Sequence, residues 1–215
     1  MTEYNGQVFQ DMFVEKITNK YNGTFLEIGS NHPIISNNTY ILEKKYNWKG
    51  IMVEYLSEFK SLYESTRPNS IHVFQDARHV NYRELLDKHF NTNLDYLQID
   101  LDVNNKSTLD TLYVLNNTVF DKYKFATVTF EHDIYTGDYF NTRELSRQIF
   151  KDRGYVLTFP DVNVFWENSY KKFEDWYIHP DLISSEIIDK CKTISSLNKE
   201  EIKIILDSIT PTSSI

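Results

Sequence analysis

The chain has 215 residues and a formal net charge of −8, which argues against a basic face that would bind nucleic acid. Its one cysteine, Cys191, excludes a disulfide framework within the chain and a cysteine-rich zinc site. The N-terminal residues show no signal peptide, and no run is apolar enough to span a membrane. We therefore expect one soluble, cytoplasmic domain over residues 1–215, with no nucleic-acid partner. A homodimer is left open.

Strands that alternate with helices follow a helical start. Apolar residues recur at helical spacing over 7–21, which predicts an N-terminal helix within residues 1–20. Short apolar runs predict buried strands over 24–29, 49–55, 70–78, 94–102 and 125–133. Amphipathic helices are expected over 37–47, 56–66, 81–90, 107–115 and 141–154. Gly154 is the expected stop signal of the last of these helices.

The end of the chain departs from this alternation. Residues 155–168 are expected to form two strands that turn at Phe159, Pro160 and Asp161. Residues 169–215 are expected to form a helical tail that frays over 210–215. This order of elements predicts an α/β fold with a core over 23–168, built on a doubly wound, mostly parallel sheet with an antiparallel C-terminal strand.

Acidic residues mark the end of every predicted parallel strand. They are Glu27, Glu54, Asp76, Asp100 with Asp102, and Glu131 with Asp133. In an open α/β sheet, ligands bind beyond the carboxyl ends of the strands. Single strands often end in a polar residue, but five acidic ends in succession indicate a ligand-binding edge.

The loop after the first strand indicates which ligand this edge binds. Gly29 is the one glycine between residues 27 and 45, so the loop has neither a dinucleotide fingerprint nor a P-loop. A positively charged nucleoside without phosphate fits an acidic edge better, and S-adenosylmethionine is such a ligand. In strand order, we expect Glu54 to bind its ribose and Asp76 its adenine amine, with Ala77 beside the ring.

Residues 23–55, "GTFLEIGSNHPIISNNTYILEKKYNWKGIMVEY", resemble the start of FkbM-type methyltransferases. The shared pattern is an acidic-x-Gly-x-Asn strand end, a Ser-Asn-Thr-Tyr-like helix start, and a Trp-Lys-Gly before a strand that ends in Glu. The similarity extends roughly over residues 7–183. It implies a Rossmann-like class I fold, S-adenosylmethionine as cofactor, and methylation of a hydroxyl on a sugar or small metabolite, with a small-molecule or glycan acceptor. The cofactor residues expected on this basis are Glu27, Gly29, Ser30, Asn31, Glu54, Asp76, Ala77 and Asp100.

Two departures from the family pattern leave a second hypothesis open. His32-Pro33 stands where family members commonly have Asp-Gly, and proline has no N–H and a fixed φ. Residues 100–104 read Asp-Leu-Asp-Val-Asn in place of Asp-x-Glu-Gly. The alternative is a catalytically silent, methyltransferase-like module that binds a partner or glycan.

The candidate catalytic residues are His132, as the base that removes the acceptor proton, and Asp102. Asp100 and Asp102 would face one side of a continuing strand, which is costly unless a cation or a proton is shared. With His132 they form a candidate Mg²⁺ set, which would also suit a metal-dependent hydrolase. The alternative is that Asp100 binds the cofactor amine and Asp102 lies at a helix N-terminus.

Two further groups of side chains each have two interpretations. Arg143 and Arg147 share a helix face, which is either solvated or a site for an anionic substrate. The aromatic residues of the second group either line an acceptor pocket or pack in the core, which we favour: Tyr135, Tyr139, Trp166, Trp176 and Tyr177.

Overall fold

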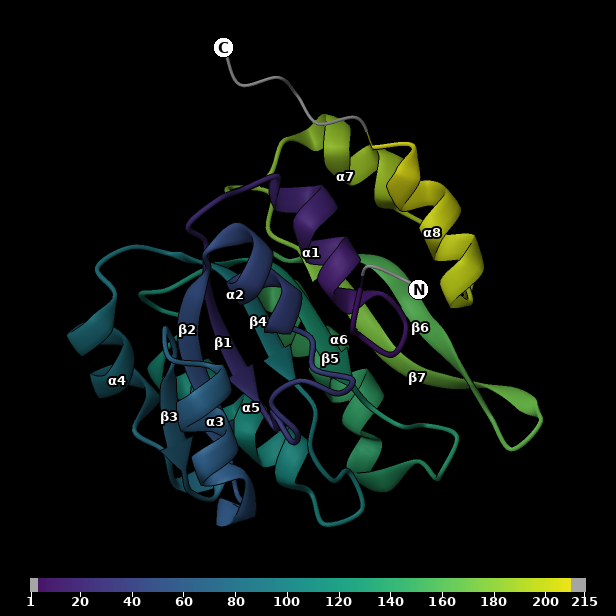
Figure 1. Ribbon diagram of the computed structural model, residues 1–215. Coiled ribbons are helices and arrows are strands. Elements are labelled where there is room, and N and C mark those ends of the chain that lie inside the picture. Colours follow the sequence, from purple (N-terminus) through teal and green to yellow (C-terminus); the bar gives the residue numbers. More distant parts are fainter. Residues whose placement is uncertain (1–3, 210–215) are drawn as a thin grey trace.

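A computed structural model describes residues 4–209, which fold around one seven-stranded sheet with helices on both faces (Figure 1). The strand order is β3-β2-β1-β4-β5-β7-β6. The strands are β1 Thr24–Ile28, β2 Lys49–Glu54, β3 Ile71–Phe74, β4 Leu94–Ile99, β5 Phe125–Glu131, β6 Val156–Trp166 and β7 Ser169–Ile178. β1 to β5 run parallel, and β7 is antiparallel to both β5 and β6. The predicted doubly wound, mostly parallel sheet with an antiparallel C-terminal strand is thus confirmed.

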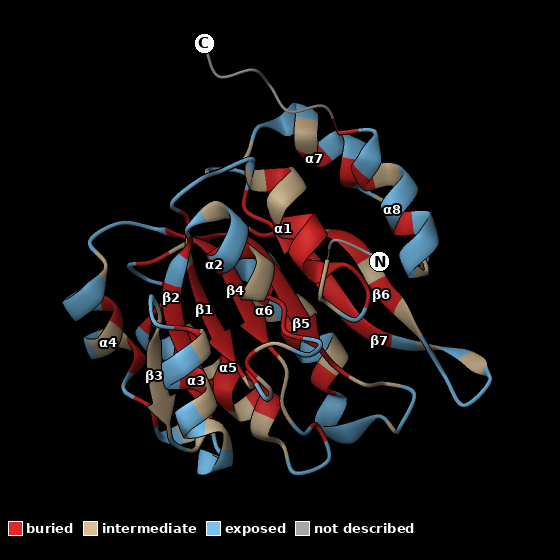
Figure 2. Ribbon diagram, viewed as in Figure 1, coloured by how far each residue is buried: buried red, intermediate tan, exposed pale blue. Residues whose placement is uncertain are grey.

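The helices lie in two layers that bury one core on each face of the sheet (Figure 2). They are α1 Gln10–Thr18, α2 Tyr40–Tyr46, α3 Lys60–Thr66, α4 Tyr82–His89, α5 Ser107–Thr118, α6 Thr142–Asp152, α7 Ser185–Cys191 and α8 Lys199–Asp207. Short 3-10 turns cover Ser57–Phe59, Ala77–His79 and Tyr139–Asn141. No helix within residues 4–209 has the length and apolar character needed to cross a membrane. The predicted frayed tail over 210–215 lies outside the described residues.

The N-terminal helix packs on the sheet as its periodicity predicts. Phe13 of α1 is fully buried, and its ring lies 4.8 Å from that of Trp176 in β7. The same face buries α7 and α8 through Cys191 and Leu206. The first and last helices of the chain therefore share one core.

The structure corrects the predicted turn at residues 159–161. β6 continues from Val156 to Trp166, and the hairpin turns at Glu167 and Asn168, which both have positive φ. Pro160 lies at a bulge, because the pairing of β6 with β7 shifts register between Phe159 and Val162. Residues 169–178, predicted as the start of a helical tail, instead form β7.

β1 and β4 approach each other so closely that no side chain fits at Gly29. A Cβ there would lie 1.7 Å from the carbonyl oxygen of Asp100, and φ of Gly29 is +82°. The amide of Asp100 donates to the carbonyl of Ile28 at 3.0 Å, which fixes this approach. The first loop and the end of β4 are therefore held together at the carboxyl edge.

Gly29→Ala should destabilise the protein more than Gly154→Ala does. Both glycines have a left-handed φ, which costs about 1–2 kcal/mol for an L side chain. A Cβ at Gly154 would meet only His179 at 3.9 Å, so this variant isolates the backbone term from the clash at Gly29. Urea unfolding of both variants measures the difference, and equal midpoints would contradict the close approach.

Candidate functional site

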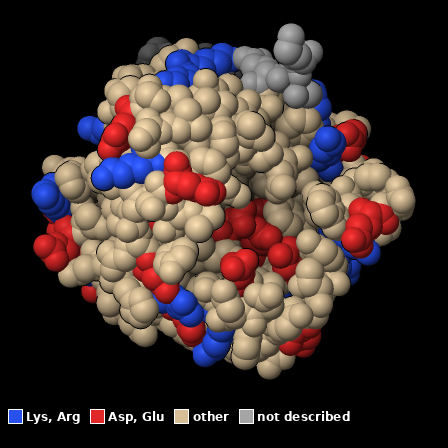
Figure 3. Space-filling model, turned by 60° about the horizontal axis from the view of Figure 1, so that its bottom comes forward, with Lys and Arg blue, Asp and Glu red and all other residues tan. Residues whose placement is uncertain are grey.

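The carboxyl edge of the sheet carries the acidic strand ends that the sequence predicts. Figure 3 shows Asp and Glu side chains gathered in a hollow of this face. Glu27 lies directly beside Gln98 in the register of β1 and β4, and Glu131 lies opposite Glu174 in β5 and β7. Because neighbouring strands in register direct paired residues to the same face, these four side chains share the face covered by α1.

Glu54 joins the loops that follow β1 and β2. Its Oε2 accepts the amide N–H of Asn31 at 2.7 Å, and its Oε1 accepts that of Leu56 at 2.9 Å. The amides of Gly29 and Ser30 both donate to the carbonyl of Val53, at 2.9 and 3.2 Å. The first loop is therefore fixed against the end of β2, where a ribose is expected.

His32 and Pro33 are ordered by specific contacts. His32 Nδ1 accepts the amides of Ile34 and Ile35, at 3.1 and 3.0 Å, so the imidazole caps the turn. The carbonyl of Pro33 accepts Arg67 Nη1 at 3.1 Å. This departure from the family pattern is thus a locally stabilised turn.

Arg67 binds several residues of the same loop. Its guanidinium is fully buried and pairs with Glu43, at 2.7 Å between Nε and Oε2. It also donates to Asn37 Oδ1 at 2.8 Å and to Thr39 Oγ1 at 2.7 Å. Thr39 Oγ1 in turn donates to Glu27 Oε2 at 2.8 Å. Burial raises the pKa of Glu27 to about 7, and the charge of Arg67 opposes that shift.

Two cavities open at this edge of the sheet. The smaller, of about 70 Å³, lies against Gly29 and is lined by Glu27, Asn38, Gln98 and Asp100 among others. The larger, of about 240 Å³, is lined by Tyr55, Asp76, Ala77, Arg78, Leu101, Asp102, Asn105 and Ser107. The predicted cofactor residues Gly29, Ser30 and Asn31 line the first cavity, and Asp76 and Ala77 line the second.

Asp76 is held by its own neighbour. Arg78 Nη2 lies 2.7 Å from Asp76 Oδ2, and its hydrogen bonds lower the pKa of Asp76 to about 2. The carboxylate is therefore charged, and Asp76 lines the larger cavity together with Ala77.

Four acidic residues lie close together at the ends of β4 and β5 and in β7. Burial raises the pKa of Asp100, Glu131, Asp133 and Glu174, most strongly for the two glutamates. Burial is the largest cause of the raised pKa of Glu131, and the neighbouring charges of Asp100 and Asp133 raise it further. Sequence analysis missed Glu174, because residue 174 was assigned to a helical tail.

The predicted metal set Asp100, Asp102 and His132 is not assembled. β4 ends at Ile99, so Asp102 does not follow the strand's alternation and is exposed, within 3.2 Å of Asn105 Nδ2. His132 follows β5 on the face opposite Glu131. The Mg²⁺ prediction and the hydrolase that depended on it are therefore not supported.

His132 instead belongs to a buried ion-pair network. Its imidazole is fully buried, with Nε2 3.4 Å from Asp161 and 3.6 Å from Asp175, and these carboxylates raise its pKa. Arg147 donates to Asp175 at 2.7 and 2.8 Å and to Asp161 at 3.0 Å. His132, Asp161 and Asp175 lie close enough to ligate an ion. However, Arg147 already pairs with both carboxylates, and Arg143 and Lys172 also pair with Asp161. His132 is thus placed to orient β6 and β7 and faces neither cavity.

The remaining predicted side chains divide between core and surface. Trp176 and Tyr177 are buried in the two cores, as we favoured for the aromatic group. Trp166 is exposed near the tip of the β6–β7 hairpin, and Tyr135 and Tyr139 are exposed in the loop after β5. Arg147 pairs with Asp161 and Asp175 of the protein itself. It is therefore neither part of a solvated helix face nor a site for an anionic substrate, the two interpretations that the sequence suggested.

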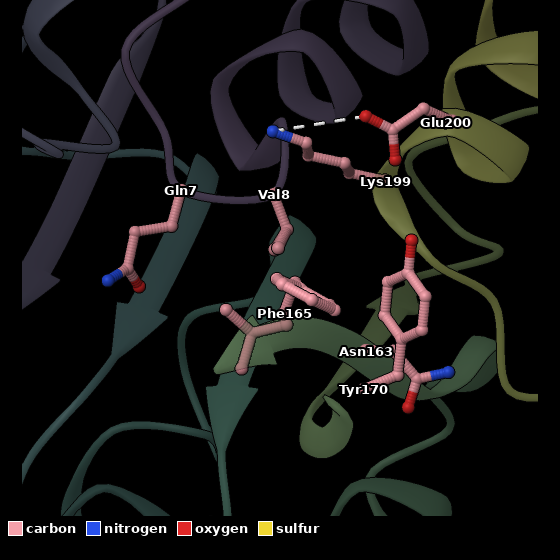
Figure 4. Close-up of a pocket in the computed structure, with 8 residues that line it drawn as sticks. Gln7, Val8, Asn163, Phe165, Tyr170, Lys199 and Glu200 are labelled. Atoms are coloured by element: carbon pink, nitrogen blue, oxygen red, sulfur yellow. Dashed lines mark ion pairs between the residues drawn. The ribbon is translucent and has the colours of Figure 1, made fainter. Parts of the chain in front are cut away.

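A third cavity, of about 320 Å³, lies between the N-terminal segment, the β6–β7 hairpin and α8 (Figure 4). Phe165 and Tyr170 form its aromatic wall, and Lys199 and Glu200 form an ion pair at its edge. Gln7 lines both this cavity and the small one against Gly29, so the two share a wall.

Comparisons with known proteins identify the fold. No protein-family model matches the sequence, and neither does any curated protein. The N-methyltransferase NodS from Bradyrhizobium japonicum WM9 matches with a TM-score of 0.56 at 9% identity, over 81% of this chain and 94% of that chain. A precorrin-6y C5,15-methyltransferase from Geobacter metallireducens GS-15 matches with a TM-score of 0.52 at 15% identity, over 79% of this chain and 84% of that chain. A methyltransferase from Pyrococcus furiosus matches with a TM-score of 0.50 at 14% identity, over 80% of this chain and 82% of that chain. The chain therefore has the Rossmann-like methyltransferase fold.

Arg67→Met should destabilise the protein by about 3–5 kcal/mol, because it leaves the buried carboxylate of Glu43 without its partner. Arg83→Met removes an arginine from a partly exposed ion pair and should cost less than about 1 kcal/mol. The double variant Arg67→Met, Glu43→Gln should regain part of the loss. Urea unfolding measures all three, and equal losses for Arg67→Met and Arg83→Met would contradict the buried network.

The carboxyl group of Glu27 should make stability fall as the pH rises. Its pKa is about 7 in the folded protein against 4.5 for an ordinary glutamate, so the folded state binds the extra proton between these values. The stability it contributes is present below about pH 4.5 and is lost as the pH rises through about 7. Glu27→Gln removes this dependence. Unfolding midpoints of both proteins at about pH 5 and about pH 8 test this, and parallel pH profiles would contradict it.

Proposed function

We propose that the protein is an S-adenosylmethionine-dependent methyltransferase. The observation that carries the proposal is the position of Glu54, which ends β2 of a methyltransferase fold directly against the Gly29 loop. An acid at this point can accept both ribose hydroxyls. The FkbM-like sequence over 25–54 supports the same function, as does the lack of phosphate-binding glycines.

The residues present fit the cofactor at each of its ends. Glu54 would bind the ribose, and the cavity lined by Asp76, Ala77 and Leu101 would take the adenine. The methionine end would lie over Gly29, where the missing Cβ allows close approach to the backbone, with Asp100 beside its ammonium group. The acidic edge favours a cofactor with a sulfonium and an ammonium group and would repel a pyrophosphate.

The chain's own residues would supply orientation and a proton acceptor. S-adenosylmethionine supplies an activated methyl group, so holding the acceptor in line with the sulfonium is the main task of the protein. The acceptor expected from the sequence is a hydroxyl of a sugar or small metabolite. Asp102, which is exposed and lines the larger cavity, is the candidate that would receive the hydroxyl proton.

Glu54→Gln should weaken the binding of S-adenosylhomocysteine by about 10- to 100-fold, as expected for losing hydrogen bonds to a charged acceptor. Glu58→Gln is the matched control, because Glu58 is exposed in the next turn and should leave affinity unchanged. Isothermal titration calorimetry gives both affinities, with circular dichroism to confirm folding. A folded wild-type protein that binds no S-adenosylhomocysteine would refute the proposed function.

A further inference from the structure

The β6–β7 hairpin extends beyond the carboxyl edge of the sheet, the edge where ligands bind in α/β folds (Figure 1). β5 ends at Glu131, which pairs with Glu174 of β7, and Glu174 pairs with Val162 of β6. Phe165 and Tyr170 pair with each other further along the hairpin, about 10 to 13 Å past that level at about 3.3 Å per residue. This part of the hairpin therefore borders the space beyond the strand ends.

Phe165 and Tyr170 form the aromatic wall of the third cavity while most of their surface is exposed (Figure 4). Phe165 is 60% and Tyr170 is 55% exposed, and their ring centroids lie 5.3 Å apart at an interplanar angle of 68°. The volume of the cavity, about 320 Å³, falls in the range of about 300–1,000 Å³ that is usual for small-molecule sites. Exposed apolar surface beside such a cavity is typical of a ligand-binding groove. The wall is therefore suited to the apolar face of a ring.

The charged and polar groups that line the third cavity favour a neutral ligand. Its charged lining residues are Lys199 and Glu200, which have opposite signs and lie 3.9 Å apart between Nζ and Oε1. Within residues 4–209, the structure gives no hydrogen bond to the side chains of Gln7 and Asn163 or to the hydroxyl of Tyr170. Amide and phenol groups both donate and accept hydrogen bonds, as the hydroxyl groups of a ligand do. The lining therefore fits an uncharged molecule with several hydroxyl groups better than an anion or a cation.

The third cavity adjoins the space proposed for the methionine end of the cofactor. Gln7 lines both the third cavity and the small cavity against Gly29. The segment that carries Gln7 is fixed through Asn5, whose Nδ2 donates to the carbonyl of Ile34 at 2.7 Å and whose amide donates to Asp11 Oδ2 at 2.6 Å. A ligand in the third cavity would thus lie one residue away from the cofactor cavity.

We propose that the third cavity is the acceptor site and that it binds a neutral sugar ring against Phe165 and Tyr170. This inference rests on the proposed function and assigns that function an acceptor site with its specificity-determining residues. One face of a pyranose ring carries C–H groups that can lie against an aromatic ring, while its hydroxyl groups bond to polar lining residues. In the transfer, a hydroxyl oxygen of the sugar forms a bond to the methyl carbon as the carbon–sulfur bond breaks. The hydroxyl proton passes to the candidate base Asp102, and the products are a methyl ether and S-adenosylhomocysteine.

The test measures sugar binding to protein saturated with S-adenosylhomocysteine, by saturation-transfer difference NMR. The probes are the methyl pyranosides of glucose, galactose, mannose, fucose and rhamnose. The matched controls are glucitol, which has the hydroxyl groups without the ring, cationic glucosamine and anionic glucuronate. At least one pyranoside should bind more tightly than all three controls by about fivefold or more, as burial of one face of the ring would give. If no neutral pyranoside binds more tightly than glucitol, the inference is wrong.

Two neighbouring aromatic residues of β6 provide a variant and its matched control. Phe165→Ala should weaken binding of the preferred pyranoside by about fivefold or more and raise KM for its methylation to the same extent, with the affinity for S-adenosylhomocysteine unchanged. Trp166→Ala should change neither, because Trp166 is 58% exposed, points to the opposite side of β6 and is not among the residues that line the cavity. Both side chains are exposed, so both variants should fold. Equal losses of sugar binding in the two variants would overturn the inference.

The inference and the proposed function fail in different ways. Incubation of the preferred pyranoside with S-adenosylmethionine should yield its methyl ether, which mass spectrometry detects, and a pyranoside that binds without being methylated would overturn the acceptor site. Protein that binds S-adenosylhomocysteine but prefers no pyranoside would overturn the inference alone. Wild-type protein that binds no S-adenosylhomocysteine would instead refute the proposed function.

Discussion

Between β1 and β4 the backbone leaves no room for a side chain at Gly29, because the carbonyl oxygen of Asp100 lies where its Cβ would be. This contact sets the distance between the first loop and the end of β4. Glu54 then fixes the same loop to the end of β2 through the amide of Asn31. Three strand ends are thereby held in one arrangement, and both cavities of the candidate site are bounded by them. A backbone contact thus shapes the site before any ligand is considered.

The buried acids at the carboxyl edge of the sheet differ in whether a basic side chain pairs with them. Arg147 pairs with Asp161 and Asp175 beside the imidazole of His132, and Arg143 and Lys172 also pair with Asp161. These ion pairs join α6 to the β6–β7 hairpin. On the face covered by α1, Glu131 and Glu174 have no such partner and keep protons through burial. Alternation along β5 separates Glu131 from His132, so two adjacent residues belong to two different clusters.

The sequence predicted the fold well because strand order and buried periodicity are local signals. It also placed acids at the carboxyl edge, since parallel strands end together there. The prediction failed at Phe159-Pro160-Asp161, because a bulge that contains proline has the same sequence signal as a turn. The prediction therefore placed the hairpin too early in the chain and missed β7 with Glu174. It grouped His132 with Asp100 because adjacency in sequence does not reveal which face a side chain takes after a strand ends. The cap formed by His32 and the carbonyl of Pro33 bound by Arg67 depend on tertiary contacts that no motif encodes.

The place of β7 between β5 and β6 also constrains the order in which the chain assembles. β6 precedes β7 in the sequence but reaches the sheet only through it, so β6 has no strand partner until β7 has been made. The two strands must therefore dock on β5 as a preformed hairpin, a contact between segments far apart in sequence that forms slowly. During synthesis, the five parallel strands can pair first, while the β7 edge of the sheet and Glu131 remain uncovered. Folding intermediates of this protein should thus expose β5 and the side chain of Glu131 until the hairpin docks.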